Sequence, residues 1–208
     1  MHITVKRVVM IAVFSALSAL LYIFIKFPLP IFPSFLDVNI SMIPVIICSF
    51  VLGPVDASVC VLIRCLIKLP FSTTGYVGEL ADLIMGLVTS IPCGLIYKIK
   101  LKHKTFIAFL LVPVMWVLSG IITNIYINIP FYVDFYFDGD TEPLLGMCRD
   151  AFKLISFGHI TNITMDDFMF YYIVLAIIPF NLLLSLIVVI ITIPIHKRLK
   201  RLYDQIGH

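Results

Sequence analysis

Long apolar segments constrain this chain more than any other feature. The segments 106–129 and 168–195 contain no Asp, Glu, Lys or Arg. A helix that crosses the hydrocarbon core of a bilayer needs about 20 such residues. Of the 208 residues, 61% are hydrophobic and 13% are charged, whereas soluble domains average roughly 45–50% and 25%. Because lipid is needed to cover that much apolar surface, we predict an all-α membrane protein with a single domain, residues 1–208.

Six helical spans are predicted. They cover about residues 8–25, 40–52, 56–69, 77–97, 106–129 and 168–195. The second and third are short, so we expect protein rather than lipid to cover part of their surface. The first resembles the apolar region of a secretory signal, but no small-residue cleavage site follows it, and we interpret it as a retained helix.

Basic residues fall into three groups that set the predicted orientation. Lys6 and Arg7 precede the first span, four lysines lie in 98–104, and four basic residues lie in 197–201. Six alternating spans place all three groups on one side, which the positive-inside rule identifies as the cytoplasm. Both termini are therefore predicted to be cytoplasmic. The lysines of 98–104 would alternatively suit a patch that binds lipid or nucleic acid.

Two long loops are predicted to lie outside the cell. Residues 26–39, the first outer loop, are rich in Pro and Phe and suit a stiff apolar cover over a pocket. Residues 130–167, the fifth loop, contain a segment, 143–156, with apolar residues at helical spacing. That segment is predicted to form a short amphipathic helix on the membrane surface or over the pocket.

Charged side chains inside the predicted spans are functional candidates, because they are costly in a bilayer. Arg64 and Lys68 share one helical face, as do Glu79 and Asp82. We expect Arg64 to pair with Glu79 or Asp82, and Lys68 to extend its amine to the outer surface. A structural ion pair and a contact with a ligand fit the two acidic residues about equally.

Three asparagines lie in the outer halves of the last two spans: Asn124, Asn128 and Asn181. An amide both donates and accepts hydrogen bonds, which suits an uncharged heterocycle with a mixed polar edge. Hydrogen bonding between neighbouring helices is the alternative interpretation.

The sequence contains no motif for ATP hydrolysis or for metal binding. There is no G-x-x-x-x-G-K-[ST] loop for ATP hydrolysis and no H-E-x-x-H metal motif. The five histidines are scattered and the five cysteines form no CxxC pair, so we expect no metal site, no resident cofactor and buried free thiols. A small intramembrane enzyme that uses Arg64, Glu79 and Asp82 remains an alternative from a different class.

Ala12 and Ala16 form a small-xxx-small motif in the first span. Small residues at this spacing let another helix approach closely. The motif fits packing within the chain or a docking face for another subunit.

Together these features resemble the S components of energy-coupling-factor (ECF) vitamin transporters, and within them the riboflavin-specific branch. The motifs that carry the resemblance are, in chain order, PSFLDVNISMIP (33–44) followed by Gly53-Pro54, GYVGELADL (75–83), Asn124 six residues before Pro130, and PFNL (179–182). They extend over nearly the whole chain outside 131–167.

The resemblance implies the substrate-binding subunit of an importer in the bacterial cell membrane. It would capture riboflavin or FMN and work with a transmembrane coupling protein and two ABC ATPases, with Ala12 and Ala16 as its docking face. The ligand-binding residues implied by the resemblance and the outer-half polar pattern are Phe32, Phe35, Leu36, Val38, Asn39, Tyr76, Gly78, Glu79, Asn124, Asn128 and Asn181.

Departures from the branch pattern leave the ligand open. Leu184 stands where the branch has a lysine that holds the flavin, Asp82 stands for an asparagine, and Asn39 and Met42 stand for acidic residues. The ligand would be riboflavin held differently, FMN, or another compound such as thiamine, a pyrimidine, folate or a queuosine precursor.

Overall fold

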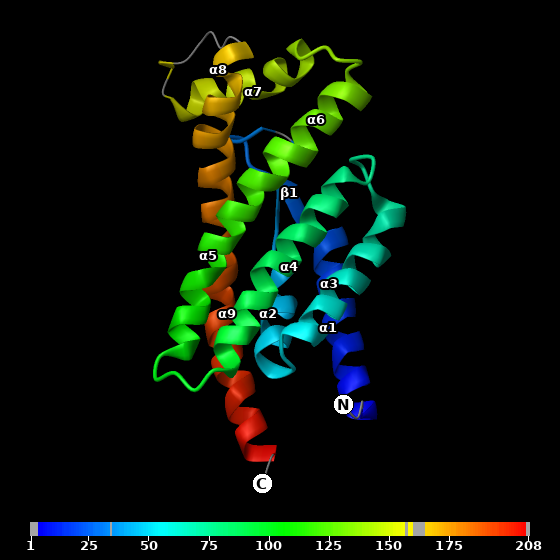
Figure 1. Ribbon diagram of the computed structural model, residues 1–208, viewed down its shortest axis with the longest axis vertical. Coiled ribbons are helices and arrows are strands. Elements are labelled where there is room, and N and C mark those ends of the chain that lie inside the picture. Colours follow the sequence, from blue (N-terminus) through cyan, green and yellow to red (C-terminus); the bar gives the residue numbers. More distant parts are fainter. Residues whose placement is uncertain (1–3, 34, 157, 160–164, 207–208) are drawn as a thin grey trace.

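The computed structural model describes residues 4–33, 35–156, 158–159 and 165–206. They form an elongated bundle of helices (Figure 1). Four continuous helical stretches are long and apolar enough to cross a membrane: Val5–Phe24, Val77–Lys98, Lys104–Tyr136 and Asp167–Leu199. The prediction of a helical membrane protein is therefore confirmed at this level.

Two shorter helices lie between the first two long ones. Helix α1 (Val5–Phe24) is followed by α2 (Met42–Val51) and α3 (Pro54–Lys68), and a 3-10 turn, η1 (Leu69–Phe71), leads towards α4 (Val77–Lys98). Every residue of α2 from Met42 to Phe50 is buried, so protein encloses this helix as expected from its length. Gly53 makes the turn between α2 and α3 with a φ of 107°, a conformation that favours glycine.

The last two membrane helices contain π-helical turns just before a proline. Helix α5 (Lys104–Thr123) continues through η2 (Asn124–Asn128), α6 (Ile129–Phe131) and η3 (Tyr132–Tyr136), and α8 (Met165–Tyr171) continues through η4 (Tyr172–Ile177) into α9 (Ile178–Ile206). Segment η2 precedes Pro130 and η4 precedes Pro179. A π-helical turn gives new hydrogen-bond partners to the backbone groups that a proline leaves free. The helix that begins at Lys104 therefore continues beyond residue 129, where the sequence analysis predicted its end.

The first outer loop contains strands that the sequence analysis did not predict. Strand β1 (Lys26–Pro28) pairs antiparallel with β2 (Asp37–Asn39), with Phe27 opposite Val38. The two strands bring the ends of the loop together beside the upper part of the bundle (Figure 1).

The predicted helix in the long outer segment is present as α7 (Glu142–Ile155). It lies across the upper end of the bundle (Figure 1). Its buried residues Leu144, Leu145, Cys148 and Phe152 form one cluster with Phe168 and Tyr172 of the last helix. Burial raises the pKa of the Cys148 thiol to about 12, so this thiol is protonated at neutral pH.

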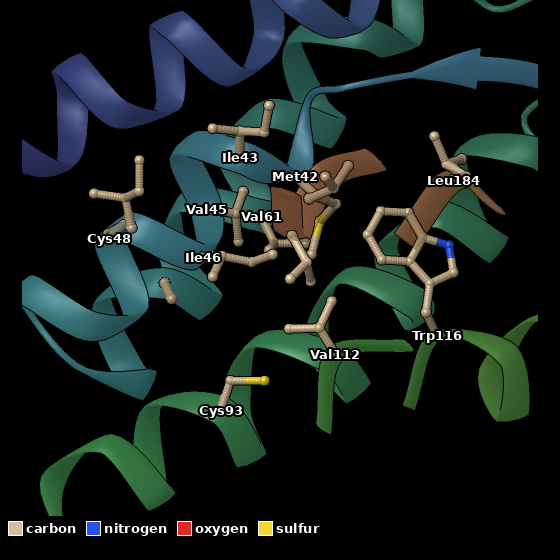
Figure 2. Close-up of a cluster of buried hydrophobic side chains, with 14 of the residues drawn as sticks. Met42, Ile43, Val45, Ile46, Cys48, Val61, Cys93, Val112, Trp116 and Leu184 are labelled. Carbon is tan, nitrogen blue, oxygen red and sulfur yellow. The ribbon is translucent and has the colours of Figure 1, made fainter. Parts of the chain in front are cut away.

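An apolar core fills the middle of the bundle. Figure 2 shows Met42, Ile46 and Val61 from α2 and α3 facing Val112 and Trp116 of α5, with Leu184 of α9 at the edge of the cluster. The start of α1, the end of α9 and the basic α4–α5 connection all lie at the lower end, opposite α7 (Figure 1).

Replacing Gly94 of α4 with alanine is expected to destabilise the protein by roughly 1–3 kcal/mol, the usual range for overpacking. A Cβ at this position would meet Ser49 Oγ and lie 3.0 Å from the backbone nitrogen of Pro54. Thermal unfolding in detergent measures the change. Gly146→Ala is the matched control, because that helical glycine has no atom within 4 Å of the added Cβ; a similar loss in both variants would contradict the packing argument.

Candidate ligand-binding site

A cavity opens between the first outer loop, α4, α5 with η2, and α9. Most of the residues predicted from the sequence line it. They are Phe35, Leu36, Asn39, Gly78, Glu79, Asn124, Asn128 and Asn181. Residues that are far apart in the chain therefore converge at one place near the upper end of the bundle.

Three predicted residues do not line this cavity. Phe32 is buried and packs edge-on against Phe180, with ring centroids 5.3 Å apart, so it supports a lining residue instead. Val38 is buried in the core cluster. Tyr76 precedes α4 with a φ of 70°, and its side chain is 62% exposed.

Other lining residues were not predicted as ligand contacts. They include Tyr22 of α1, Thr73 and Thr74 before α4, Thr123 of α5 and Phe180 of α9. Phe180 could have been predicted as a lining residue, because it precedes Asn181 within the PFNL motif. Tyr22 could not, because a lone aromatic residue in an apolar span is ordinary.

The buried cation Arg64 pairs with Asp82 across the α3–α4 contact. The guanidinium is fully buried, donates from Nη1 to Ser41 Oγ at 2.9 Å, and lies 5.2 Å from the centroid of the Tyr22 ring. Ser41 in turn donates to Asn39 Oδ1 at 2.6 Å. Arg64 therefore joins α3 to α1, to α4 and to the end of the first outer loop.

Lys68 does not extend to the outer surface, so that prediction is wrong. Its side chain is 4% exposed, with Nζ 3.5 Å from Glu79 Oε1 and 2.9 Å from the Phe71 carbonyl oxygen. Glu79 Oε2 also accepts hydrogen bonds from Ser72 at 2.7 Å and Thr74 at 3.0 Å. These partners compensate the buried ammonium group, which otherwise would favour contact with water.

The three predicted asparagines lie on two helices that face the cavity, α5 with η2 and α9. Asn124 Nδ2 donates to the Gly120 carbonyl at 2.8 Å, and Asn128 Nδ2 donates to Asn124 Oδ1 at 3.2 Å. Asn181 Nδ2 donates to the Ile177 carbonyl at 2.8 Å. These three bonds lie within single helices rather than between neighbouring helices, and all three asparagines line the cavity. Their role as ligand contacts stays a prediction.

A second cavity adjoins the first on its outer side. The two share Phe35, Asp37, Thr73 and Thr74, and the outer one is also lined by Tyr132 and Tyr136 of η3 and by Leu144 and Met147 of α7. Helix α7 therefore lines the outer cavity but not the inner one.

Position 184, where the riboflavin-specific branch has a lysine, lies away from the cavity. Leu184 is 3% exposed and belongs to the apolar core with Met42 and Trp116 (Figure 2). Within the described residues, no group of three or more His, Cys, Asp or Glu side chains is placed to hold a metal ion. The site offers amides, hydroxyls, aromatic rings and paired charges.

Comparison with known proteins identifies the family. Residues 6–196 match the family model described as ECF transporter, substrate-specific component. The chain is 28% identical over 204 residues to the riboflavin transporter RibU of Staphylococcus aureus (strain TCH60), across 97% of this chain and 94% of that protein. A solved structure titled "Structure and mechanism of the S component of a bacterial ECF transporter" is 26% identical, with a TM-score of 0.66, and covers 95% of this chain and 96% of that one. This chain therefore belongs to the substrate-specific components of ECF transporters.

Family membership decides between two classes considered from the sequence. The family consists of transport subunits that work with an ECF module, and its members are not enzymes. The chain is accordingly a multi-pass protein of the bacterial cell membrane that takes part in transport. The alternative of an intramembrane enzyme built on Arg64, Glu79 and Asp82 is set aside.

Replacing Arg64 with methionine is expected to destabilise the protein by roughly 3–5 kcal/mol, because Asp82 then remains as a buried charge without its partner. The double variant Arg64→Met with Asp82→Leu should recover much of that loss. Lys26→Met is the matched control, since Lys26 and Asp37 are 3.7 Å apart and about one third exposed, and such pairs contribute about 0–1 kcal/mol. Thermal unfolding in detergent measures all three; an equally unstable double variant would contradict the pairing argument.

Proposed function

We propose that this chain captures riboflavin outside the cell and delivers it inward after docking with an energising module. The observation that carries the proposal is the similarity to a riboflavin transporter, 28% identity across 97% of the chain. The family supplies the transport role, and the chemistry of the cavity supports the kind of ligand.

The lining suits a flat heterocycle with polar edges. Tyr22, Phe35 and Phe180 offer aromatic surface, while Asn124 and Asn181 offer amides. Small-molecule pockets are mostly apolar, with a few placed polar groups that orient the ligand. An isoalloxazine ring presents large faces for the aromatic residues and a mixed donor and acceptor edge for the amides.

The charges around the cavity favour a neutral ligand. Lys26 lies 3.7 Å from Asp37, Lys68 lies 3.5 Å from Glu79, and Asp82 is paired with Arg64. Among the lining residues that the structure describes, every Lys, Asp and Glu thus has an oppositely charged partner. A phosphate group needs cations that are available to it. We therefore propose riboflavin over FMN, and the same argument disfavours cationic thiamine and anionic folate.

We further propose six spans, with α2 and α3 completing the membrane domain beside the four long helical stretches. Both termini and the basic α4–α5 connection would be cytoplasmic, in keeping with the positive-inside rule and with their common lower position in Figure 1. The cavity, which lies toward the opposite end, would then open to the outside.

The exposed face of α1 is the proposed docking surface for the transmembrane coupling protein of the module, which carries two ABC ATPases. Ala12 and Ala16 are exposed, as are their neighbours Val9 and Val13 at 53% and 51%. The buried residues Ser15, Ser18 and Ala19 lie on the other side of the helix. Two small residues on an exposed apolar face would permit a close helix–helix contact.

Titration in detergent with riboflavin and FMN, followed by quenching of flavin fluorescence, tests the ligand. We expect riboflavin to bind with a Kd below about 10 μM and FMN to bind at least tenfold more weakly, about 1.4 kcal/mol. Asp37→Asn removes the partner of Lys26, which leaves a cation available to the phosphate of FMN, so the difference in affinity between riboflavin and FMN should narrow. Glu142→Gln, which removes the partner of Arg149 on α7, is the control. Failure of both ligands to bind at 10 μM would overturn the flavin proposal.

Replacing Ala12 and Ala16 with tryptophan should abolish uptake of radiolabelled riboflavin by cells that carry the whole transporter, because the bulky rings prevent close docking. Riboflavin binding to the purified variant should be unchanged. Leu118→Trp is the control, because Leu118 is also exposed, at 48%, but lies on α5. Uptake that survives the α1 substitutions would remove these alanines from the docking surface.

A further inference from the structure

Three hydrogen bonds fix the orientation of the Asn124 amide. Its Nδ2 donates to the carbonyl oxygen of Gly120 at 2.8 Å. A carbonyl oxygen only accepts hydrogen bonds, so this contact identifies the end of the amide that carries the N–H groups. The oxygen of Asn124 therefore faces the other way, toward Asn128 and Tyr172.

Tyr172 and Asn128 occupy that oxygen. The hydroxyl of Tyr172 donates to Asn124 Oδ1 at 2.9 Å, and Asn128 Nδ2 donates to the same atom at 3.2 Å. An amide oxygen has two lone pairs, so these two donors use its capacity. What Asn124 still offers to a ligand is its second N–H, which makes it a donor toward the cavity.

Asn181 has the opposite polarity. Its Nδ2 donates to the Ile177 carbonyl, and no residue in the described part of the chain donates to its Oδ1. The two amides are neighbours, because a Cβ built on Gly120 would lie 2.8 Å from Asn181 Nδ2 while the Gly120 carbonyl binds Asn124. An available N–H and an available carbonyl oxygen thus lie close to Gly120.

We propose that Tyr172 is a positioning residue that, together with the Gly120 carbonyl and Asn128, maintains the hydrogen-bonding polarity of the cavity by holding the amide of Asn124. Tyr172 is 1% exposed and does not line the cavity itself. With its hydroxyl in place, Asn124 offers a donor, beside the acceptor that Asn181 offers independently of Tyr172. This pair complements a ligand edge on which a carbonyl lies beside an N–H, as in the imide group of flavins. The assignment of that edge rests on the proposed riboflavin function.

The surroundings of Tyr172 keep its hydroxyl aimed at Asn124. Its ring stacks on Phe168, with centroids 5.5 Å apart, and lies 6.3 Å from the ring of Phe35 in the first outer loop. Tyr172 begins η4 and Asn124 begins η2, so both partners occupy π-helical turns. Such turns inside membrane helices are often found at functional sites.

Tyr172→Phe removes only the hydroxyl and leaves the ring. Binding is measured for riboflavin and for its 2-thio and 4-thio analogues, in which one carbonyl becomes a poor acceptor. The wild type should prefer riboflavin over the analogue altered at the carbonyl bound by Asn124 by roughly five- to tenfold, the range for one neutral hydrogen bond. In Tyr172→Phe the amide keeps its bonds to Gly120 and Asn128 but loses the shortest of the contacts to its oxygen, so the amide is held less firmly, riboflavin affinity should fall by up to a similar factor, and the preference should narrow.

A purely structural role would weaken all three ligands equally and leave the preference intact, which would overturn the proposal. Tyr97→Phe is the matched control, because Tyr97 is near the opposite end of α4; neither affinity nor preference should change in that variant.

A second measurement needs no ligand. Thermal unfolding of Tyr172→Phe, Asn124→Ala and the double variant forms a double-mutant cycle, and the double variant should be less destabilised than the sum of the single changes. Additive effects would overturn the assignment. Coupling in this cycle, together with no binding of riboflavin to the wild type, would reject the riboflavin proposal and leave the role of Tyr172 intact.

Discussion

Much of this structure depends on a cation that has no contact with water. Arg64 is fully buried, and its partners come from four parts of the chain: Tyr22 of α1, Ser41 before α2, Asp82 of α4 and, through Ser41, Asn39 of the first outer loop. An unpaired charge in this setting is very unfavourable, so these elements stay together as a group. Gly86 makes the arrangement possible, because a Cβ there would lie 2.7 Å from Val61 Cγ1 and 3.2 Å from Arg64 Nη2.

The sequence was sufficient for the parts that depend on local pattern. Apolar length predicted the long helices, and helical spacing predicted α7. The sequence was insufficient where the packing between helices determines which side chains meet. Whether Arg64 pairs with Glu79 or Asp82 depends on how α3 and α4 pack, and Lys68 is buried because Glu79 and the Phe71 carbonyl are within reach. Tyr172 gave no signal, because its function depends on the orientation of an amide on another helix.

The position of Leu184 explains why the cavity contains no cation from α9. Asn181 and Leu184 lie three residues apart on one side of the helix, yet Asn181 lines the cavity and Leu184 lies in the apolar core. The boundary between the cavity and the apolar core therefore lies within a single turn of α9. A charged side chain at position 184 would begin among Met42, Val112 and Trp116 (Figure 2), where it would need to extend upward to find a polar partner.

The π-helical turns η2 and η4 also determine how this chain tolerates the loss of a residue. A π turn holds one residue more than an α turn in the same helix. Deleting a single residue from η2 or η4 would give an ordinary helix of nearly unchanged length. The residues on the two sides of the deletion would keep their directions, because the extra residue is taken up within the turn. Only the side chains of the turn itself would be redistributed, so the bond between Tyr172 and Asn124, which lie in these turns, would be lost while the apolar exterior of the helix stayed suited to lipid.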